Sequence, residues 1–586
     1  MILRYRLLVF LSLISLGNLI YAQETISQDV KVVRAYTPTL SDAYKVNLMP
    51  EMRDTSSFRP QFNYHILSKS MAVDYIVEPI APAKLGKDRK EQLTNSYVKG
   101  GLGNYTTVFG ELEYNILQSE PYLLRLNLGH LTSLGELKLE DDSKVEAPFH
   151  DTWAGINFKH FFDDKTLSVD LCFLHNIYKY YGYQTLNPEQ DYFLPEAGSS
   201  IKGETLIPED RQRLSSVRFN IGLENSEEAN SEVQYATSLN FLSFGNYTGV
   251  KQNGFGLKGR VNGHVNDLNL FADASVNYYG TSVPDSDAPM YHFSKRNNTL
   301  ITVSPGIRFQ FDNAHVNVGV LLAGEFDTDD EYFRVAPNIT GELNVVEGIV
   351  SIFGGITGKV NQNDYASVQY ENPFVSADQN VKSSFYGINV QAGIKGNFSS
   401  ATSFSADVAY SFFEDEHFFV NKMYAQSTGI GPHDVGDVIN YSNLFVAQHD
   451  DGKLLQVRGE MLFHPGKNIE IVARGTYSGW NLDSLKHAWH KPEVELNLNG
   501  RFMPMENLYV DAGISFLGKR FAFVPEETNE KKLDPVVDLN IGAEYRYSSK
   551  WTFFAQLNNI AASKYYKWNG YPMQGINVRA GVGFSF

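Results

Sequence analysis

The sequence predicts an all-β fold: a transmembrane antiparallel β-barrel of about 22 strands, preceded by a short irregular N-terminal segment. Three observations support this fold class. Apolar and polar residues alternate along most of the chain from Tyr97 onward, as in strands whose two faces meet different surroundings. Short turns alternate with long polar connections, and the chain begins with an export signal.

The export signal covers residues 1–22. Arg4 and Arg6 form its basic start, an apolar core follows from Leu7 to Leu16, and the small residue Ala22 marks a cleavage site before Gln23. Elsewhere no run of about 18 apolar residues occurs, which argues against a helical membrane span.

Residues 23–95 differ in composition from the rest of the chain. Prolines and a charged stretch from Lys84 to Glu91 interrupt any long strand or helix. We expect an extended segment that faces the periplasm or inserts into the barrel lumen. The prolines are Pro38, Pro50, Pro60, Pro79 and Pro82.

The barrel is predicted to occupy residues 96–586, and its last three strands are the clearest. They cover 537–547, 551–557 and 576–586, with a tight turn at 548–550 and a long connection at 561–575. In the last strand the apolar residues alternate with polar residues and glycines. Phe584 and Phe586 at its end are the predicted C-terminal assembly signal. The apolar set is Ile576, Val578, Ala580, Val582, Phe584 and Phe586.

Long polar connections are predicted to form the outer loops. Loops on a rigid barrel can contact ligands or partners, but plain solvated loops are an equally good interpretation. The main loops are predicted at 138–150, 184–210, 284–297, 361–383, 420–451, 482–492 and 525–534.

Strand parity also predicts which side chains line the lumen. Both signs of charge alternate along this set, which favours mutually paired charges over the single-sign ring of an ion-selective pore. The predicted lumen-lining residues are Gln456, Arg458, Glu460, Glu470, Arg474, Glu495, Arg501, Asp511, Asp538, Glu544, Arg546 and Arg579.

Charge and reactive residues exclude several functions. A net charge of −17 disfavours nucleic acid, and anionic lipid in general, as a partner. The single cysteine, Cys172, cannot form an intramolecular disulfide. Clusters at 327–331, 414–417 and 487–490 lack the spacing of zinc or calcium sites and are expected to be solvated loops. We predict no catalytic residue, metal or cofactor, and therefore no enzyme.

The C-terminal stretch resembles a known family. The run Asn558-Asn559-Ile560, the Lys564-Tyr565-Tyr566 segment, the turn at 570–575 and the terminal Phe586 resemble the final hairpin of TonB-dependent receptors, particularly those of Bacteroidota. The resemblance implies a 22-stranded barrel in the outer membrane of a Gram-negative bacterium, with a role in transport or uptake. Outer-membrane lipid, the barrel-assembly machinery and TonB or other envelope proteins would be its partners. A segment weakly similar to a TonB box comprises Asp29, Val30, Val32 and Val33.

The chain departs from this family because residues 23–95 are too short for a full plug domain. An unfilled barrel of this size would breach the membrane, so the N-terminal segment, inward-folded loops or a partner must close it. Three functions therefore remain open: a transport receptor, a non-transporting scaffold in an outer-membrane complex, and a passive porin-like pore.

Overall fold

The structure is a computed structural model, and it describes residues 96–117, 121–194, 198–225, 232–266, 268–284, 291–346, 348–427, 435–525 and 529–586. The predicted signal peptide, the segment 23–95 and the TonB-box-like residues Asp29, Val30, Val32 and Val33 lie outside these ranges. Their predicted roles therefore stay predictions.

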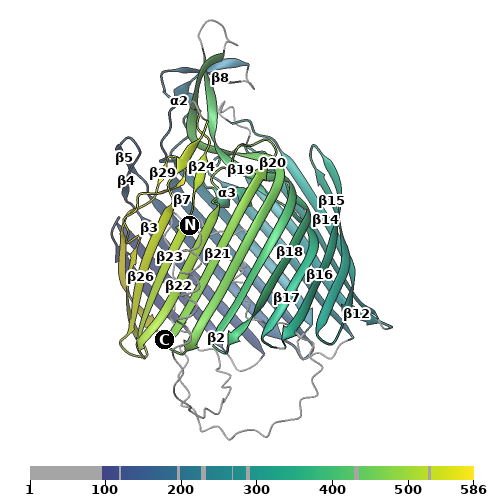
Figure 1. The fold of residues 1–586 in the computed structure, drawn as a ribbon. Helices are drawn as coiled ribbons and strands as arrows, with labels where there is room; N and C mark the ends of the chain where they lie inside the picture. The colour runs from purple at the N-terminus through teal and green to yellow at the C-terminus, as the bar shows by residue number, and fades with distance from the viewer. Residues whose placement is uncertain are drawn as a thin grey trace, which may run out of the picture. The chain divides into compact units, whose positions relative to one another are not determined.

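The described chain forms a closed antiparallel barrel of 22 strands, as the sequence predicts (Figure 1). Consecutive barrel strands pair with one another. The barrel strands are β1(Ser96–Gly103), β2(Thr107–Leu117), β3(Tyr122–Ser133), β6(Phe149–Phe161), β7(Lys165–Lys179), β10(Arg211–Asn225), β11(Val233–Asn246), β12(Lys251–Val265), β13(Leu268–Ser282), β14(Arg296–Gln310), β15(Ala314–Asp327), β16(Glu331–Val346), β17(Val350–Asn361), β18(Ser384–Ser399), β19(Thr402–Ser427), β20(Val435–Gly466), β21(Ile469–Leu482), β22(Val494–Met505), β23(Leu508–Leu517), β26(Val536–Arg546), β27(Trp551–Asn558) and β30(Asn577–Ser585).

The barrel closes where its last strand meets its first. β1 and β30 pair from Tyr97↔Ser585 to Gly103↔Arg579, and the Phe586 amide donates to the Ser96 carbonyl at 3.0 Å. Closure leaves no unpaired edge along the membrane-spanning wall, which is the condition for a sheet to cross a bilayer.

The two ends of the barrel differ in their connections. Long loops gather at one end, here called the long-loop end, whereas the C-terminus and short turns lie at the opposite, short-turn end (Figure 1). The remaining elements belong to long loops, and among the described residues no helix is long and apolar enough to span a membrane. These elements are β4(Glu136–Lys138), β5(Lys144–Glu146), β8(Asp191–Leu194), β9(Ser199–Lys202), α2(Gly203–Leu206), α3(Tyr365–Glu371), β24(Arg520–Ala522), β25(Lys531–Leu533), β28(Tyr566–Trp568) and β29(Tyr571–Pro572).

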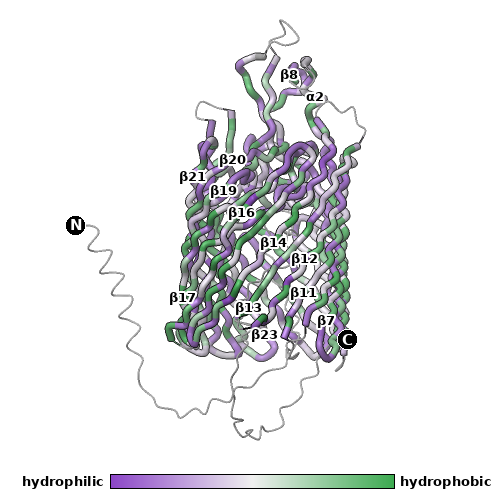
Figure 2. The backbone as a smooth tube through the Cα atoms, turned by 90° about the vertical axis from the view of Figure 1, so that its right-hand side faces the viewer, coloured by the Kyte–Doolittle hydropathy of each residue, from purple (hydrophilic) through white to green (hydrophobic). Residues whose placement is uncertain are grey.

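Side chains alternate between the two faces of the wall. Figure 2 shows this alternation as hydrophobic and hydrophilic segments that follow one another along the strands. On β22, Leu496 and Leu498 are exposed on the outward face while Arg501 pairs with Asp511 on the other face. Large outward apolar side chains with no protein cover are what a barrel presents to lipid.

One prediction about the loops is wrong. The sequence analysis places a loop at 420–451, but most of this range continues β19 and β20, which pair with each other as far as Ser427↔Val435. Phe418, Phe419 and Val420 are all buried because both faces of β19 are covered here, so the alternation that identifies strands elsewhere is missing. The extended strands project beyond the barrel, where β8 pairs with β19 (Figure 1).

Candidate functional site at the long-loop end

The loops at the long-loop end fold over the barrel opening and share one buried core, here called the mouth cluster. Its members come from β7 and the loop residue Tyr181 after it, from β19 and β20, and from the loops 362–383 and 559–576, with the loop 483–493 packed beside them. All are less than a tenth exposed. The mouth cluster comprises Tyr178, Tyr181, Phe374, Phe419, Phe445, Trp568 and Tyr571, with His490 packed beside them.

The loop 362–383 begins with helix α3. Asp364 caps this helix: its carboxylate accepts the Ser367 amide at 3.0 Å, and the Ser367 hydroxyl accepts the Asp364 amide at 3.0 Å. This capping box satisfies two backbone donors that a helix start would leave unpaired, and such a cap is worth about 1 kcal/mol. A helix of two turns can therefore form at the start of this loop.

The loop 362–383 connects β17 and β18, but helix α3 and the residues after it contact strands on a distant part of the barrel. The Tyr370 hydroxyl donates to the Ser216 hydroxyl on β10 at 2.7 Å, and the Tyr178 hydroxyl on β7 donates to the Pro373 carbonyl at 2.6 Å. The Ala366 amide donates to the Gln252 side chain on β12. Because β7 lies eight strands from β17 in the barrel order, the loop crosses the opening rather than following the rim.

The same loop is then fixed to β20. Val375 and Phe445 form a parallel β-bridge, with Phe445 N donating to Phe374 O at 2.9 Å and Ser376 N donating to Phe445 O at 2.8 Å. Val375 and Phe445 are completely buried. Backbone pairing of this kind fixes the segment more firmly than side-chain packing alone, because it satisfies main-chain groups that burial would otherwise leave unpaired.

The loop 559–576 enters from the other side of the opening. Its Tyr571 ring stacks on Phe374 with centroids 3.5 Å apart, and the Tyr571 hydroxyl donates to the Asn443 carbonyl at 2.9 Å. Gly570 has a φ of +80°, and a Cβ there would lie 2.8 Å from the Tyr183 carbonyl oxygen, so this approach requires glycine. Two loops rooted at distant strands therefore meet over the lumen.

His490 connects three segments of the mouth cluster. Its Nδ1 lies 2.8 Å from the Phe419 carbonyl, and its Nε2 lies 3.2 Å from the Asn569 amide. A carbonyl only accepts and an amide only donates, so the ring is neutral with its proton on Nδ1. Burial lowers the pKa of His490 to about 3, which agrees with a neutral imidazole.

A buried arginine binds the backbone of the loop 559–576. The Arg520 guanidinium, about 2% exposed, donates to the carbonyls of Tyr566 at 2.8 Å and Lys567 at 3.1 Å. Burial lowers its pKa to about 10, so the group still carries its charge at neutral pH. Asn569 adds a hydrogen bond to Asn421 of β19 at 2.9 Å.

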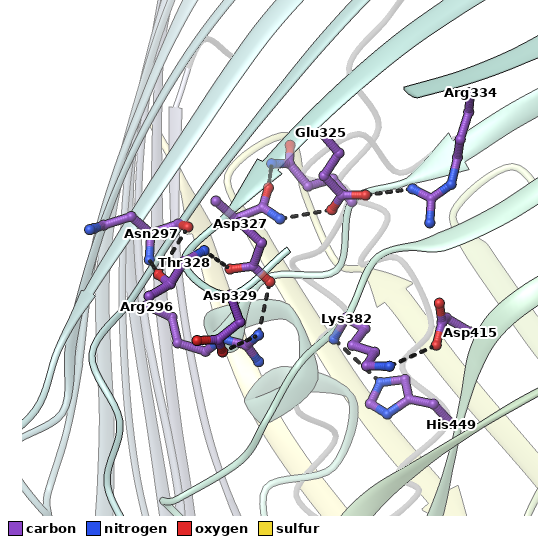
Figure 3. Close-up of polar contacts among 12 residues, drawn as sticks. Arg296, Asn297, Glu325, Asp327, Thr328, Asp329, Arg334, Lys382, Asp415 and His449 are labelled. Atoms are coloured by element: carbon purple, nitrogen blue, oxygen red, sulfur yellow. Dashed lines mark hydrogen bonds and ion pairs between the residues drawn. The ribbon is translucent and has the colours of Figure 1, made fainter. Parts of the chain in front are cut away.

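Charged groups on the wall anchor both stems of the loop 362–383 (Figure 3). Glu325 pairs with Arg334 at 2.5 Å and accepts the Asn298 side chain, which in turn accepts Gln362 at the start of the loop. At the other stem Lys382 pairs with Asp415 at 3.1 Å. Both members of the Arg334–Glu325 pair are buried, so losing one partner would leave an uncompensated charge.

Below the mouth cluster, several predicted lumen-lining residues form ion pairs. Arg474 lies 3.2 Å from Glu460, and Arg501 lies 2.7 Å from Asp511. Arg458 pairs with Asp407, which the sequence analysis did not include, at 2.6 Å. The first and third pairs line a concavity of about 670 Å³ on the wall between β15 and β21. Charges of both signs are thus paired along this wall.

The other predicted residues lie in different surroundings. Asp538, Glu544 and Arg579 are buried, and the Tyr565 hydroxyl of the loop 559–576 donates to Asp538 at 3.3 Å. Arg546 packs over the Tyr509 ring. Gln456, Glu470 and Glu495 make no side-chain hydrogen bond or ion pair with the part of the chain that the structure describes.

The two C-terminal aromatic residues lie at the short-turn end. Phe584 packs on Trp551 with ring centroids 4.9 Å apart, and Phe586 stacks on Phe584 and Tyr114. The exposed Tyr547 lies in the turn before Trp551. Aromatic side chains at a strand end are typical of a membrane interface.

Two expectations about polar clusters are wrong. Residues 414–417 and 487–490 were expected to be solvated loops, yet Glu416, His417, Trp489 and His490 are all buried. The Lys491 ammonium pairs with Glu416 at 2.6 Å and lies over the Phe418 ring. The local sequence carries no sign of this burial, because the covering groups come from loops distant in the chain.

Comparisons with known proteins give the fold a context. No family model and no curated protein matches the sequence. Among solved structures, the pyoverdine outer membrane receptor FpvA of Pseudomonas aeruginosa is similar with a TM-score of 0.58 at 12% identity, covering 84% of this chain and 78% of that chain. The FrpB iron transporter of Neisseria meningitidis has a TM-score of 0.58 at 10% identity, with coverages of 84% and 81%. The ferric-catecholate import receptor Fiu of E. coli has a TM-score of 0.57 at 9% identity, with coverages of 85% and 82%. The chain has the barrel fold of these receptors.

Proposed function

We propose that the protein is an outer-membrane transport receptor of a Gram-negative bacterium whose opening is closed at rest by the mouth cluster. The fold shared with FpvA, FrpB and Fiu supports membrane insertion and uptake, and those proteins are named as receptors or transporters rather than enzymes. The substrate class stays open. Outer-membrane lipid, the barrel-assembly machinery and TonB or another envelope protein are the partners that this proposal requires.

The observation that carries the proposal is the crossing of the opening by loops from distant strands. A passive pore needs a permanently open path, whereas here Phe374 and Tyr571 stack on each other in a buried core over the lumen. The stems of the loop 362–383 are hydrogen-bonded and ion-paired, so this loop can move as a unit about fixed ends. Regulated opening therefore fits the geometry better than free diffusion.

A disulfide lock tests this proposal. Val375 and Phe445 are bridge partners, and the backbones of such partners lie close enough for a disulfide. A strain that lacks the gene is first tested for lost uptake of ferric chelates, cobalamin or oligosaccharides. We expect cells that carry Val375→Cys/Phe445→Cys to lose the same uptake when they are oxidised. The uptake should return when the disulfide is reduced. The single Val375→Cys variant is the matched control. Uptake that persists through the oxidised lock would contradict regulated opening.

The second candidate is a non-transporting scaffold. It is favoured by the projection of β19, β20, β8 and β9 beyond the barrel, which offers a surface for a partner. In that case deletion of the gene would change which envelope proteins co-purify but would deplete no nutrient from the medium. The oxidised disulfide would then change neither the co-purifying envelope proteins nor the depletion of nutrients from the medium.

A further inference from the structure

A group of basic side chains lies on the outward face of the wall near the long-loop end, on β3, β6, β7, β10 and β12. These strands, with β11 between the last two, are consecutive in the barrel. We call the group the basic patch. It comprises His130, His150, His175, Lys179, Arg211, Arg213 and Lys251.

Strand register brings the patch together. His175 pairs with Ser215, and one step toward the loops Ile177 pairs with Arg213 and Lys179 with Arg211. The His130 and His150 rings stack with centroids 6.3 Å apart. Lys251 stands opposite Gly245, which has no side chain to separate it from β10.

The patch adjoins the lipid-facing band. On the same face, the next residues toward the short-turn end are Phe173 on β7 and Val217 on β10, followed by Leu171, and all three are exposed apolar side chains. Phe241 and Phe255 continue this band on β11 and β12. The basic groups therefore stand where the hydrocarbon core gives way to lipid headgroups.

Most of the positive charge in the patch has no ion-pair partner among the described residues. Arg211, Arg213 and Lys251 form no ion pair with the described residues, and Arg211 and Arg213 are exposed. Lys179 pairs with Glu146 at 2.8 Å. The nearby Glu209 accepts the Tyr247 hydroxyl at 2.7 Å.

The three imidazoles are held in place through one nitrogen each. The Nδ1 atoms of His130, His150 and His175 lie 2.7–2.8 Å from the hydroxyls of Thr152, Thr132 and Ser215 respectively. This arrangement leaves each Nε2 as a possible donor toward an anionic group outside the protein.

We propose that the basic patch binds the phosphate groups of an anionic lipid in the outer leaflet. The proposal rests on the membrane placement in the proposed function. Phosphate suits a cluster of arginine, lysine and histidine donors, and the adjoining apolar band can contact the acyl chains of the same molecule. The net charge of −17 repels anions in general, so the attraction must be local to this patch.

Native mass spectrometry of the purified full-length protein tests the proposal, with phosphatidic acid and phosphatidylcholine of the same acyl chains as probes. We expect phosphatidic acid to bind more tightly, and Arg211→Gln/Arg213→Gln to weaken it roughly thirtyfold, at about 1 kcal/mol per residue. Lys532→Gln/Lys550→Gln is the control, because it removes the same charge from exposed residues elsewhere. Heat-modifiable migration verifies that each variant is folded.

Equal phosphatidic acid binding by the patch variant and the wild type would overturn the proposal. Full displacement of the lipid by millimolar inorganic phosphate would also overturn it, because the patch would then be a site for free phosphate. The lipid-binding assay requires neither a transported substrate nor opening of the mouth cluster. A negative result here therefore leaves the transport proposal standing, and a failed uptake test leaves lipid binding standing.

Discussion

Replacing Tyr571 by alanine should loosen the mouth cluster without unfolding the barrel. Tyr571 is about 1% exposed, stacks on Phe374 at 3.5 Å and donates to the Asn443 carbonyl. Truncating a buried aromatic side chain costs about 3–5 kcal/mol. If the mouth cluster opens as a local unit, this raises the fraction of open molecules roughly 10²- to 10⁴-fold. Tyr571→Phe keeps the stack and loses one hydrogen bond, at about 1 kcal/mol.

Hydrogen exchange measured by mass spectrometry can follow this change segment by segment. We expect faster exchange in 362–383 and 559–576 for Tyr571→Ala, a small change for Tyr571→Phe, and no change in β22. Tyr247→Ala is the control, since it removes an exposed tyrosine from the same end of the barrel. Unchanged exchange in both loops, with a folded barrel, would refute the claim that their contact holds the opening shut.

Three further predictions concern the wall, the buried histidine and the C-terminus. Leu498→Lys should impair folding, measured by heat-modifiable migration, because a lysine that faces lipid costs about 2–4 kcal/mol. The control Asn499→Lys places the lysine on the inward face and should have a much milder effect. Equal folding defects in the two variants would contradict the assigned faces. The mouth cluster should loosen as pH falls, because the pKa of His490 is about 3 in the folded protein and about 6.5 in the unfolded chain. The contribution of the neutral imidazole to stability is therefore complete above pH 6.5. Below pH 6.5 it falls by about 1.4 kcal/mol per pH unit. His490→Gln should lose this dependence in the exchange of 559–576, and an identical acid response would reject the assignment. Deleting Phe586 should reduce assembled protein but not export, because it removes the bond to Ser96 at the closing seam; normal outer-membrane levels would argue against this.

The barrel could be predicted from the sequence because each spanning strand has one face toward lipid. Alternation such as that of Val578, Ala580 and Val582 is a direct consequence of two different surroundings, and it is readable without knowing any partner strand. The same rule fails at Phe418, Phe419 and Val420, where both faces are covered. The alternation of residues predicts a strand wherever its two faces contact lipid and water, and it fails where another loop covers a face.

The candidate site could not be predicted in the same way. Phe374 and Tyr571 lie almost two hundred positions apart in the chain, and each looks like an ordinary aromatic residue in a polar loop. Their contact depends on how far each loop reaches across the opening, which the capping of α3 and the φ of Gly570 decide. Inward-folded loops were among the alternatives for closing the lumen, but no local pattern of residues distinguishes these alternatives.

Single-channel conductance in planar bilayers tests most directly whether the mouth cluster closes the barrel. Four forms should be compared: the wild type, a deletion of residues 24–90, Phe374→Ala/Tyr571→Ala, and the deletion combined with these two substitutions. We expect the deletion alone to keep a low conductance, because the mouth cluster remains, and the combined form to conduct strongly. A large conductance after the deletion alone would contradict the account, because the loops would then not be the seal.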